Sequence, residues 1–239
     1  MRFLMILMML SFLGLSWAAA WFFFGGIDED PEMKALAAYQ SHIESLIPKA
    51  STGDFQAQLK VGRLYRDGKQ HTQSYKDAVI WFKKAADRGH LEGIFELGQM
   101  YEKGLGVRQD YFQAIKLYQK AAGLGRYSKA QFALGYLYFK GKGVNQDLGR
   151  AIDLFQVAAN KGHPVAQHLL GGMYAEGWGV DKDPSQAYKW LSLAAQNKKQ
   201  VSAFDPQFNP TDLLNKLRPK MNKVQLSEAK ALLKDWKQQ

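Results

Sequence analysis

The chain has 239 residues and a mass of 27.0 kDa, and 32 Lys and Arg against 22 Asp and Glu give it a formal charge of +10. Hydrophobic residues make up 46%, which is enough for a packed core and excludes a wholly disordered chain. The absence of cysteine excludes disulfide scaffolds, cysteine-based metal sites and thiol catalysis. The positive charge permits anionic partners, but it is spread over many predicted helix faces, which is typical of a solvated surface.

The first 27 residues are predicted to be a membrane anchor or a signal peptide. No charged residue occurs from Phe3 to Ile27, a run long enough for a helix to cross a bilayer. Arg2 precedes the run and acidic residues follow it, so the positive-inside rule places the body outside the cytoplasm. Ala18-Ala19-Ala20 offers a cleavage site, but cleavage would leave the aromatic stretch 21–24 at a new N-terminus. An anchored and a secreted protein therefore stay open, and both export the body, to the periplasm or another extracytoplasmic space.

Residues 28–56 are predicted to form an N-terminal capping half-repeat. Gly53 lies 36 residues before Gly89, a spacing that recurs through the rest of the chain. Met33 to Ser51 is therefore expected to be the second helix of a partial unit, interrupted near Pro48. Repeat arrays need atypical end units with a polar outer face, and this segment suits that role.

Residues 57–197 contain four copies of a unit that is 36 or 37 residues long. An Ala-Ala pair recurs once per unit, beginning at Ala85, Ala121, Ala158 and Ala194. A Leu-Gly or Val-Gly pair recurs in the same steps, with its glycine at Gly62, Gly98, Gly135 and Gly171. A fixed period of this kind is typical of solenoids, in which each unit buries its apolar face against its neighbours.

Each unit is predicted to be a helix–turn–helix. In the third unit the first helix has a buried stripe at helical spacing, which consists of Ala130, Leu134, Leu137 and Tyr138. A Gly-x-Gly-Val turn follows, because glycine tolerates the positive φ that closes a helix. The second helix then begins at an N-cap aspartate, which is Asp110, Asp147 or Asp183.

The complete unit resembles the Sel-one-like repeat (SLR) of the tetratricopeptide-like superfamily. Its pattern is Ala-x-x-x-Leu-Gly-x-x-Tyr-x-x-Gly-x-Gly-Val-x-x-Asp-x-x-x-Ala, as seen from Ala130 to Ala151. The resemblance implies an all-α fold, a right-handed α-solenoid of helix–turn–helix repeats that binds proteins or peptides and, as a rule, has no catalysis and no cofactor. The first unit departs from the pattern at Gln70, His71 and Ser74, where the others have Gly, Val and Asp.

Residues 198–239 are predicted to be C-terminal capping helices. Val201 to Pro210 contains two prolines and is expected to be a loop. Thr211 to Arg218 and Gln225 to Trp236 are expected to be helices. The last of these resembles the helix that closes many arrays of this family.

The sequence offers no catalytic or metal-binding constellation. His163 and His168 are five residues apart with a proline between them, whereas zinc ligands on one helix face are three or four apart. Gly141-Lys142-Gly143 lacks the spacing of a phosphate-binding loop and recurs as a helix–helix turn. Periodicity brings no pair of carboxylates together. We therefore predict a protein that is not an enzyme and that holds no metal.

The partner-binding groove is predicted on the first helix of each unit, at positions three, seven and ten counted from its first alanine or the glycine that replaces it. These positions lie opposite the buried stripe, on the face that lines the groove in tetratricopeptide-like solenoids. In chain order they are Leu59, Arg63, Arg66, Phe95, Gln99, Glu102, Phe132, Tyr136, Phe139 and His168, followed by Gly172 and Ala175. The three rings of the third unit suggest an exposed aromatic patch that anchors a peptide. The alternative is that they are core, packed under a neighbouring unit or covered by a terminal helix.

Together these features predict a membrane-tethered, extracytoplasmic scaffold or regulator that docks a protein or peptide in its groove. An accessory subunit of an envelope polysaccharide or cell-wall assembly machine is the first alternative. A hydrolase is a weaker one, since the family members assigned such activity are rich in cysteine. Nucleic acid is disfavoured as a partner by the predicted export.

Overall fold

The computed structural model describes residues 31–68, 73–125 and 127–236, and this part of the chain is built of helices without strands. Its centre is four helix hairpins. The first helices of the hairpins are α4 (Phe55–Asp67), α6 (Leu91–Lys103), α8 (Ser128–Lys140) and α10 (Pro164–Glu176). The second helices are α5 (Tyr75–Asp87), α7 (Tyr111–Gly125), α9 (Leu148–Asn160) and α11 (Pro184–Gln196). The prediction of an all-helical solenoid of hairpin repeats is confirmed.

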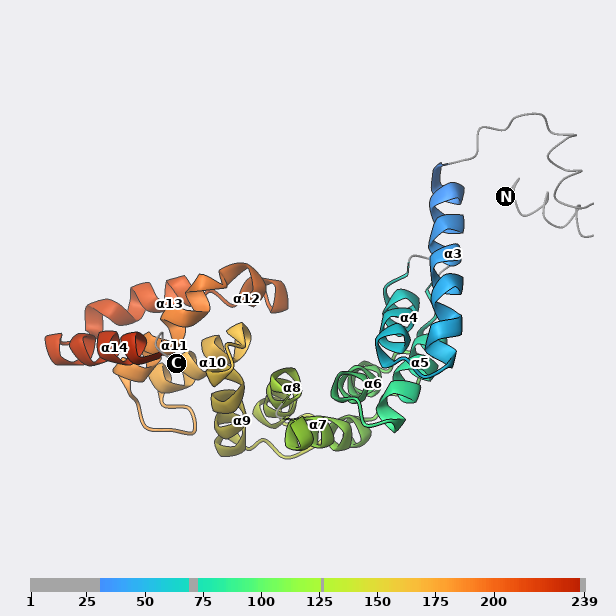
Figure 1. Ribbon diagram of the computed structural model, residues 1–239. Helices are drawn as coiled ribbons and strands as arrows, with labels where there is room; N and C mark the ends of the chain where they lie inside the picture. The colour runs from blue at the N-terminus through green and yellow to red at the C-terminus, as the bar shows by residue number, and fades with distance from the viewer. Residues whose placement is uncertain (1–30, 69–72, 126, 237–239) are drawn as a thin grey trace, which may run out of the picture.

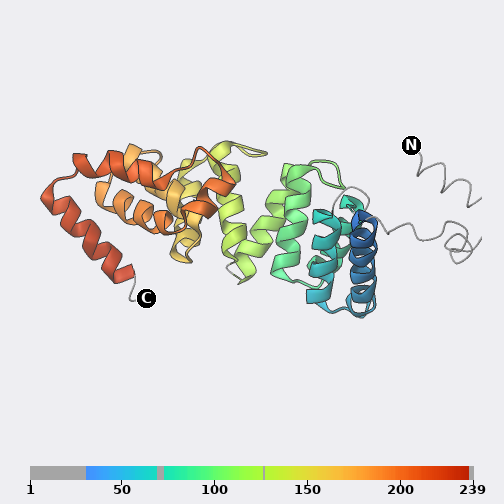
Figure 2. The same cartoon turned by 90° about the horizontal axis from the view of Figure 1, so that it is seen from above.

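The hairpins follow one another along an arc. Figure 1 shows α4, α6, α8 and α10 on the inner side of the arc, with α5, α7 and α9 on its outer side. Seen from above in Figure 2, the hairpins form one row from the blue N-terminal end to the red C-terminal end. The inner helices therefore line one continuous concave face.

The turns between the two helices of a hairpin have the predicted geometry. Gly104, Gly141 and Gly177 close the first helices in the left-handed conformation, with φ of 69°, 65° and 78°. The Asp147 carboxylate accepts a hydrogen bond from the backbone N–H of Arg150 at 2.9 Å, as the N-cap prediction requires. Asp110 and Asp183 cap their helices in the same way.

Close helix packing explains the recurring glycine of the first helices. A Cβ placed on Gly135 would lie 3.0 Å from two ring carbons of Phe155 on the second helix. Phe155 is fully buried, so no room remains for a larger residue at position 135. The predicted stripe is confirmed as well: it is buried throughout, and its residues are Ala130, Leu134, Leu137 and Tyr138.

Two predictions about the ends of the array are wrong. Helix α3 (Pro31–Ser51) is not interrupted near Pro48: the proline removes only the one hydrogen bond that its own N–H would donate, and the packing of the fully buried Ala50 holds the last turn. Val201 to Phe204 is not a loop but the second half of α12 (Lys198–Phe204). Val201 is fully buried, and its packing stabilises a helix that the composition does not favour.

The remaining helices pack at the C-terminal end of the array. They are α13 (Pro210–Leu217), the 3-10 helix η1 (Arg218–Lys220) and α14 (Lys223–Trp236). Both α13 and α14 pack on α11, while α12 packs mainly on α10. Trp236 of α14 meets the buried Trp190 of α11 edge to face, with ring centroids 5.6 Å apart.

The predicted anchor, residues 1–27, lies outside the described residues. Within the part that the structure describes, no helix combines the length and the apolar character that crossing a bilayer would need.

Candidate functional site

Position three of the first helices is buried and is not open to solvent in the groove. The four residues at this position are buried, with exposed fractions of 1% for Leu59, 8% for Phe95, 7% for Phe132 and 5% for His168. The prediction that they are accessible to a partner is wrong. In the second and third units the ring at this position packs against the N-cap residue of the next first helix. The centroids of Phe95 and Tyr127 are 5.4 Å apart, and those of Phe132 and His163 are 4.3 Å apart.

Positions seven and ten form the accessible strip of the concave face. All of these residues are partly exposed, whereas more than half of the residues of α6, α8 and α10 are buried. In the N-terminal units they are Arg63, Arg66, Gln99 and Glu102, and in the C-terminal units Tyr136, Phe139, Gly172 and Ala175. The rest of each first helix packs against its own second helix and against the preceding second helix or, for α4, against α3.

The N-terminal half of the strip carries a network of ion pairs between α4 and α6. Arg63 Nε donates to Glu96 Oε1 at 2.9 Å, and Arg63 NH2 donates to Glu92 Oε1 at 2.5 Å. Arg66 donates to Glu96 and also to both oxygens of Asp67. The Glu96 side chain is only 7% exposed, so two guanidinium groups compensate one buried carboxylate.

Sequence reasoning missed Glu92 and Glu96. Glu96 occupies position four, where the other units have Lys60, Ala133 and Leu169, so no periodicity marks it. The sequence feature that could have indicated it is a glutamate on the first helix of the second unit, with arginines on the first helix of the first unit. To use this feature, the residues of one unit must be aligned with those of the next, and the repeat step of 36 residues gives that alignment.

The network extends to α8 through Tyr127, the residue before that helix. Burial, together with the carboxylates of Glu92 and Glu96, raises the pKa of Tyr127 to about 12. The phenol therefore stays protonated at neutral pH and serves as a hydrogen-bond donor. Glu102 lies further along the strip and accepts a hydrogen bond from the Tyr118 hydroxyl at 2.6 Å. These contacts hold the polar side chains of the groove in fixed positions.

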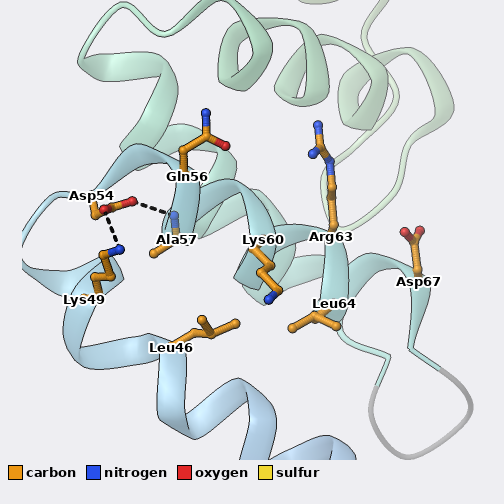
Figure 3. Close-up of a pocket in the computed structure, with 9 residues that line it drawn as sticks. All are labelled: Leu46, Lys49, Asp54, Gln56, Ala57, Lys60, Arg63, Leu64 and Asp67. Atoms are coloured by element: carbon orange, nitrogen blue, oxygen red, sulfur yellow. Dashed lines mark hydrogen bonds and ion pairs between the residues drawn. The ribbon is translucent and has the colours of Figure 1, made fainter.

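A pocket of about 480 Å³ between α3 and α4 adjoins this network. Figure 3 shows Lys60 and Leu64 pointing toward α3, while Arg63 points away from it. On the far wall, Lys49 Nζ lies 3.3 Å from the Asp54 carboxylate, which also accepts a hydrogen bond from the Ala57 N–H. The pocket is lined by Leu46, Lys49, Asp54, Gln56, Ala57, Lys60, Arg63, Leu64 and Asp67. Charges of both signs line it beside apolar surface, which suits a polar polypeptide segment.

The C-terminal half of the strip is aromatic, and the chain itself covers it. Phe204, the last residue of α12, meets both Phe132 and Tyr136 edge to face at 5.3 Å between ring centroids. Phe208 lies 4.8 Å from the His168 ring. The prediction of an exposed aromatic patch is therefore wrong for Phe132, and the alternative of cover by a terminal helix describes it. Tyr136 and Phe139 remain half-buried.

The two histidines of this half are held in neutral form. Burial lowers the pKa of His163 and of His168 to about 4 in each case. His163 Nδ1 accepts the backbone N–H of Ala166 at 3.3 Å and so caps α10, which is a structural role. Among the described residues, no group of three or more His, Asp or Glu side chains is arranged to hold a metal ion.

The stacked helix hairpins and their continuous concave face define the chain as an α-solenoid repeat protein. More specifically, it belongs to the Sel1 repeat family, whose model matches residues 55–90, 91–125, 128–163 and 164–198, more than half of the chain. Sel1 repeats generally form protein-interaction scaffolds and are generally non-catalytic.

Solved structures show similar arrays. A Sel1 repeat protein from Oxalobacter formigenes is 30% identical with a TM-score of 0.58, over 70% of this chain and 68% of that one. A protective antigen with an SLR fold, present in uropathogenic Escherichia coli strains, is 27% identical with a TM-score of 0.47. That match covers 80% of this chain but only 47% of the antigen, so the chain spans about half its length. A search of curated proteins finds no significant match.

Proposed function

We propose that this protein is a membrane-tethered, extracytoplasmic scaffold that docks a protein or peptide on the N-terminal half of its concave face. The family supports a role in protein interaction. The uncharged run from Phe3 to Ile27, with Arg2 before it and acidic residues after it, supports the tether and the export of the repeats.

The observation that carries the proposal is the open strip on α4 and α6. Its four residues, Arg63, Arg66, Gln99 and Glu102, are partly exposed on the concave side of the array. Ion pairs and hydrogen bonds hold Arg63, Arg66 and Glu102 in place before any partner arrives. Preorganised polar groups lose little side-chain entropy on binding, so they suit a polypeptide with charged side chains of both signs.

Site-specific photocrosslinking in cells tests the docking site. A photoreactive amino acid at position 99 of the full chain should capture a discrete partner protein, because Gln99 lies in the open strip. The matched control is position 83, since Lys83 is exposed on the outer helix α5. Equal capture from both positions, or capture from position 83 alone, would contradict the proposed site. The identity of the captured protein also decides whether the scaffold serves an envelope polysaccharide or cell-wall machine.

Fractionation tests the tether separately. The full chain should stay with membranes after an alkaline wash, and a chain lacking residues 1–27 should be released while it keeps its far-UV helicity. A reporter enzyme that is active only outside the cytoplasm, fused to the C-terminus, should be active. Release of the full chain by the wash, or an inactive reporter, would contradict the tether or the topology respectively.

A further inference from the structure

We propose that the aromatic half of the concave face is a second peptide site, which the chain's own residues 198–209 occupy in the absence of a partner. The partner segment that it accepts carries two aromatic side chains four residues apart. This inference rests on the proposed function to the extent that both use the concave face for polypeptide binding.

The occupying segment is an insertion in the repeat pattern. The first helices of the four units begin at Phe55, Leu91, Ser128 and Pro164. After the last unit, the helix α13, which packs on α11, begins only at Pro210. The repeat step would start that helix within α12. The extra residues that form α12 and the following loop turn onto α10 instead of extending the row. Figure 1 shows α12 on the inner side of the arc, next to α10.

The insertion is held on the groove by its aromatic side chains. Phe204 meets Phe132 and Tyr136 edge to face, the geometry that aromatic pairs prefer. Phe208 lies against His168, four residues after Phe204. Asp205 lies close enough to act on the pKa of both Tyr136 and His168. The segment thus presents two aromatic side chains, four residues apart, to the groove.

The fit of the segment is incomplete. Phe204 is 43% exposed although it touches two rings. His168 is only 5% exposed, yet its Nδ1 atom has no hydrogen-bond partner among the described residues. A buried nitrogen without a partner is unfavourable, so a segment with an N–H or O–H near Phe208 would fit better.

The segment is also held to the rest of the molecule by few hydrogen bonds of its own side chains. Helix α12 has only seven residues, fewer than a helix needs to be stable without tertiary support. Ser202 Oγ donates to the Phe208 carbonyl at 3.1 Å, and the Asp205 carboxylate accepts the Gln207 N–H, so these bonds stay within the segment. Loss of the ring contacts would therefore free the part of the segment that follows the buried Val201, without breaking the row of hairpins.

A peptide-binding experiment tests the proposal. The probe is a fluorescent synthetic peptide with the sequence of residues 198–210 of this chain. The full chain carrying both Phe204→Ser and Phe208→Ser should bind it at least ten times more tightly than the unchanged protein, because its groove is vacant. A peptide in which both phenylalanines are serine should not bind. The control variant Phe112→Ser removes a ring that is 60% exposed on the outer helix α7, and it should leave peptide binding at the level of the unchanged protein.

The following results of the peptide-binding experiment would overturn the proposal of a second site. A folded double variant that binds the peptide no better than the unchanged protein has no second site. If the double variant loses its far-UV helicity, Phe204→Ser alone decides, since it leaves Phe208 and the buried Val201 in place. A single variant that unfolds, or that stays folded without a gain in binding, shows that the segment belongs to the folding core. Failure of capture from position 99 with intact peptide binding would refute the proposed open site and leave this second site standing.

Discussion

The two halves of the concave face use the same helix positions for opposite purposes. On α4 and α6, positions seven and ten carry arginine, glutamine and glutamate, and the strip is open to solvent. On α8 they carry Tyr136 and Phe139, and the side chain of Phe204 lies over the first of these rings. The backbone of the repeats is therefore compatible with either chemistry.

The difference shows that the side chains decide whether a surface of the solenoid stays open. Ion-paired arginines and carboxylates keep favourable contact with water, so the N-terminal half needs no cover. Exposed rings cost ~25 cal/mol for each Å² of apolar surface left in water, which favours any segment that can cover them. The insertion at α12 supplies that cover from within the chain.

The largest expected effect lies in the covered half. Phe132→Ala should lower the free energy of unfolding by ~3–5 kcal/mol, because it removes a buried ring that packs on Phe155, His163 and Phe204. Chemical denaturation measures this change. Phe139→Ala, on the same helix but half-buried, should cost clearly less. Equal losses would mean that position three is no more buried than position ten.

Acidification is also expected to destabilise the covered half. The folded pKa of His163 and His168, about 4, lies below the value of ~6.5 for an unfolded chain. The unfolded state therefore binds more protons between these values, and stability falls as the pH drops from ~6.5 toward 4, by up to ~1.4 kcal/mol per pH unit for each imidazole. Lys129 strengthens the effect at His163, while Asp205 opposes it at His168.

Thermal melts between pH 7 and pH 4.5 measure this dependence. His168→Phe places in the fourth unit the residue type that Phe95 and Phe132 supply in the second and third units. It should flatten the pH profile without loss of helicity. A profile that is unchanged in this variant would show that His168 does not titrate in the way described.

A smaller effect is expected where the helices of the third hairpin approach each other. Gly135→Leu should cost ~1–3 kcal/mol, because the new side chain meets the buried Phe155 ring. Lys142→Leu, in the exposed turn of the same hairpin, should leave the melting temperature nearly unchanged. Similar melting temperatures for the two variants would contradict the close helix approach.

The smallest of the effects belongs to the open half. Glu96→Gln should cost ~1–2 kcal/mol, because it removes the buried charge that Arg63 and Arg66 share, while Glu92 and Asp67 continue to pair with them. Asp153→Asn, on the exposed surface of α9, is the control and should be neutral in the same denaturation experiment. A neutral Glu96→Gln would show that the network contributes nothing to the fold.

The sequence was sufficient to predict what lies within one repeat. The positive φ of Gly141, the cap of Asp147 and the stripe that includes Leu134 all depend on residues within one hairpin. Burial at position three depends instead on contacts between units, such as that of Phe132 with His163. Helical periodicity cannot supply such contacts, because it describes one helix without its neighbours.

The C-terminal insertion was missed for a related reason. Prolines at 206 and 210 and a short run before them indicated a loop from Val201 onward. The helix forms because Val201 is fully buried and the ring of Phe204 finds partners on the concave face. Local propensity does not include those partners.

Ring-to-ring contacts in solution test the central claim, that the chain covers the aromatic half of its own groove. Nuclear Overhauser effects can be recorded on protein in which only phenylalanine and tyrosine rings carry protons. Cross-peaks from Phe204 to Tyr136 and to Phe132 are predicted, because both pairs of ring centroids lie 5.3 Å apart. Phe204 signals at random-coil positions, without a cross-peak to either ring, would contradict the claim that α12 covers these rings. The aromatic side chains of the third unit would then belong to the open part of the groove.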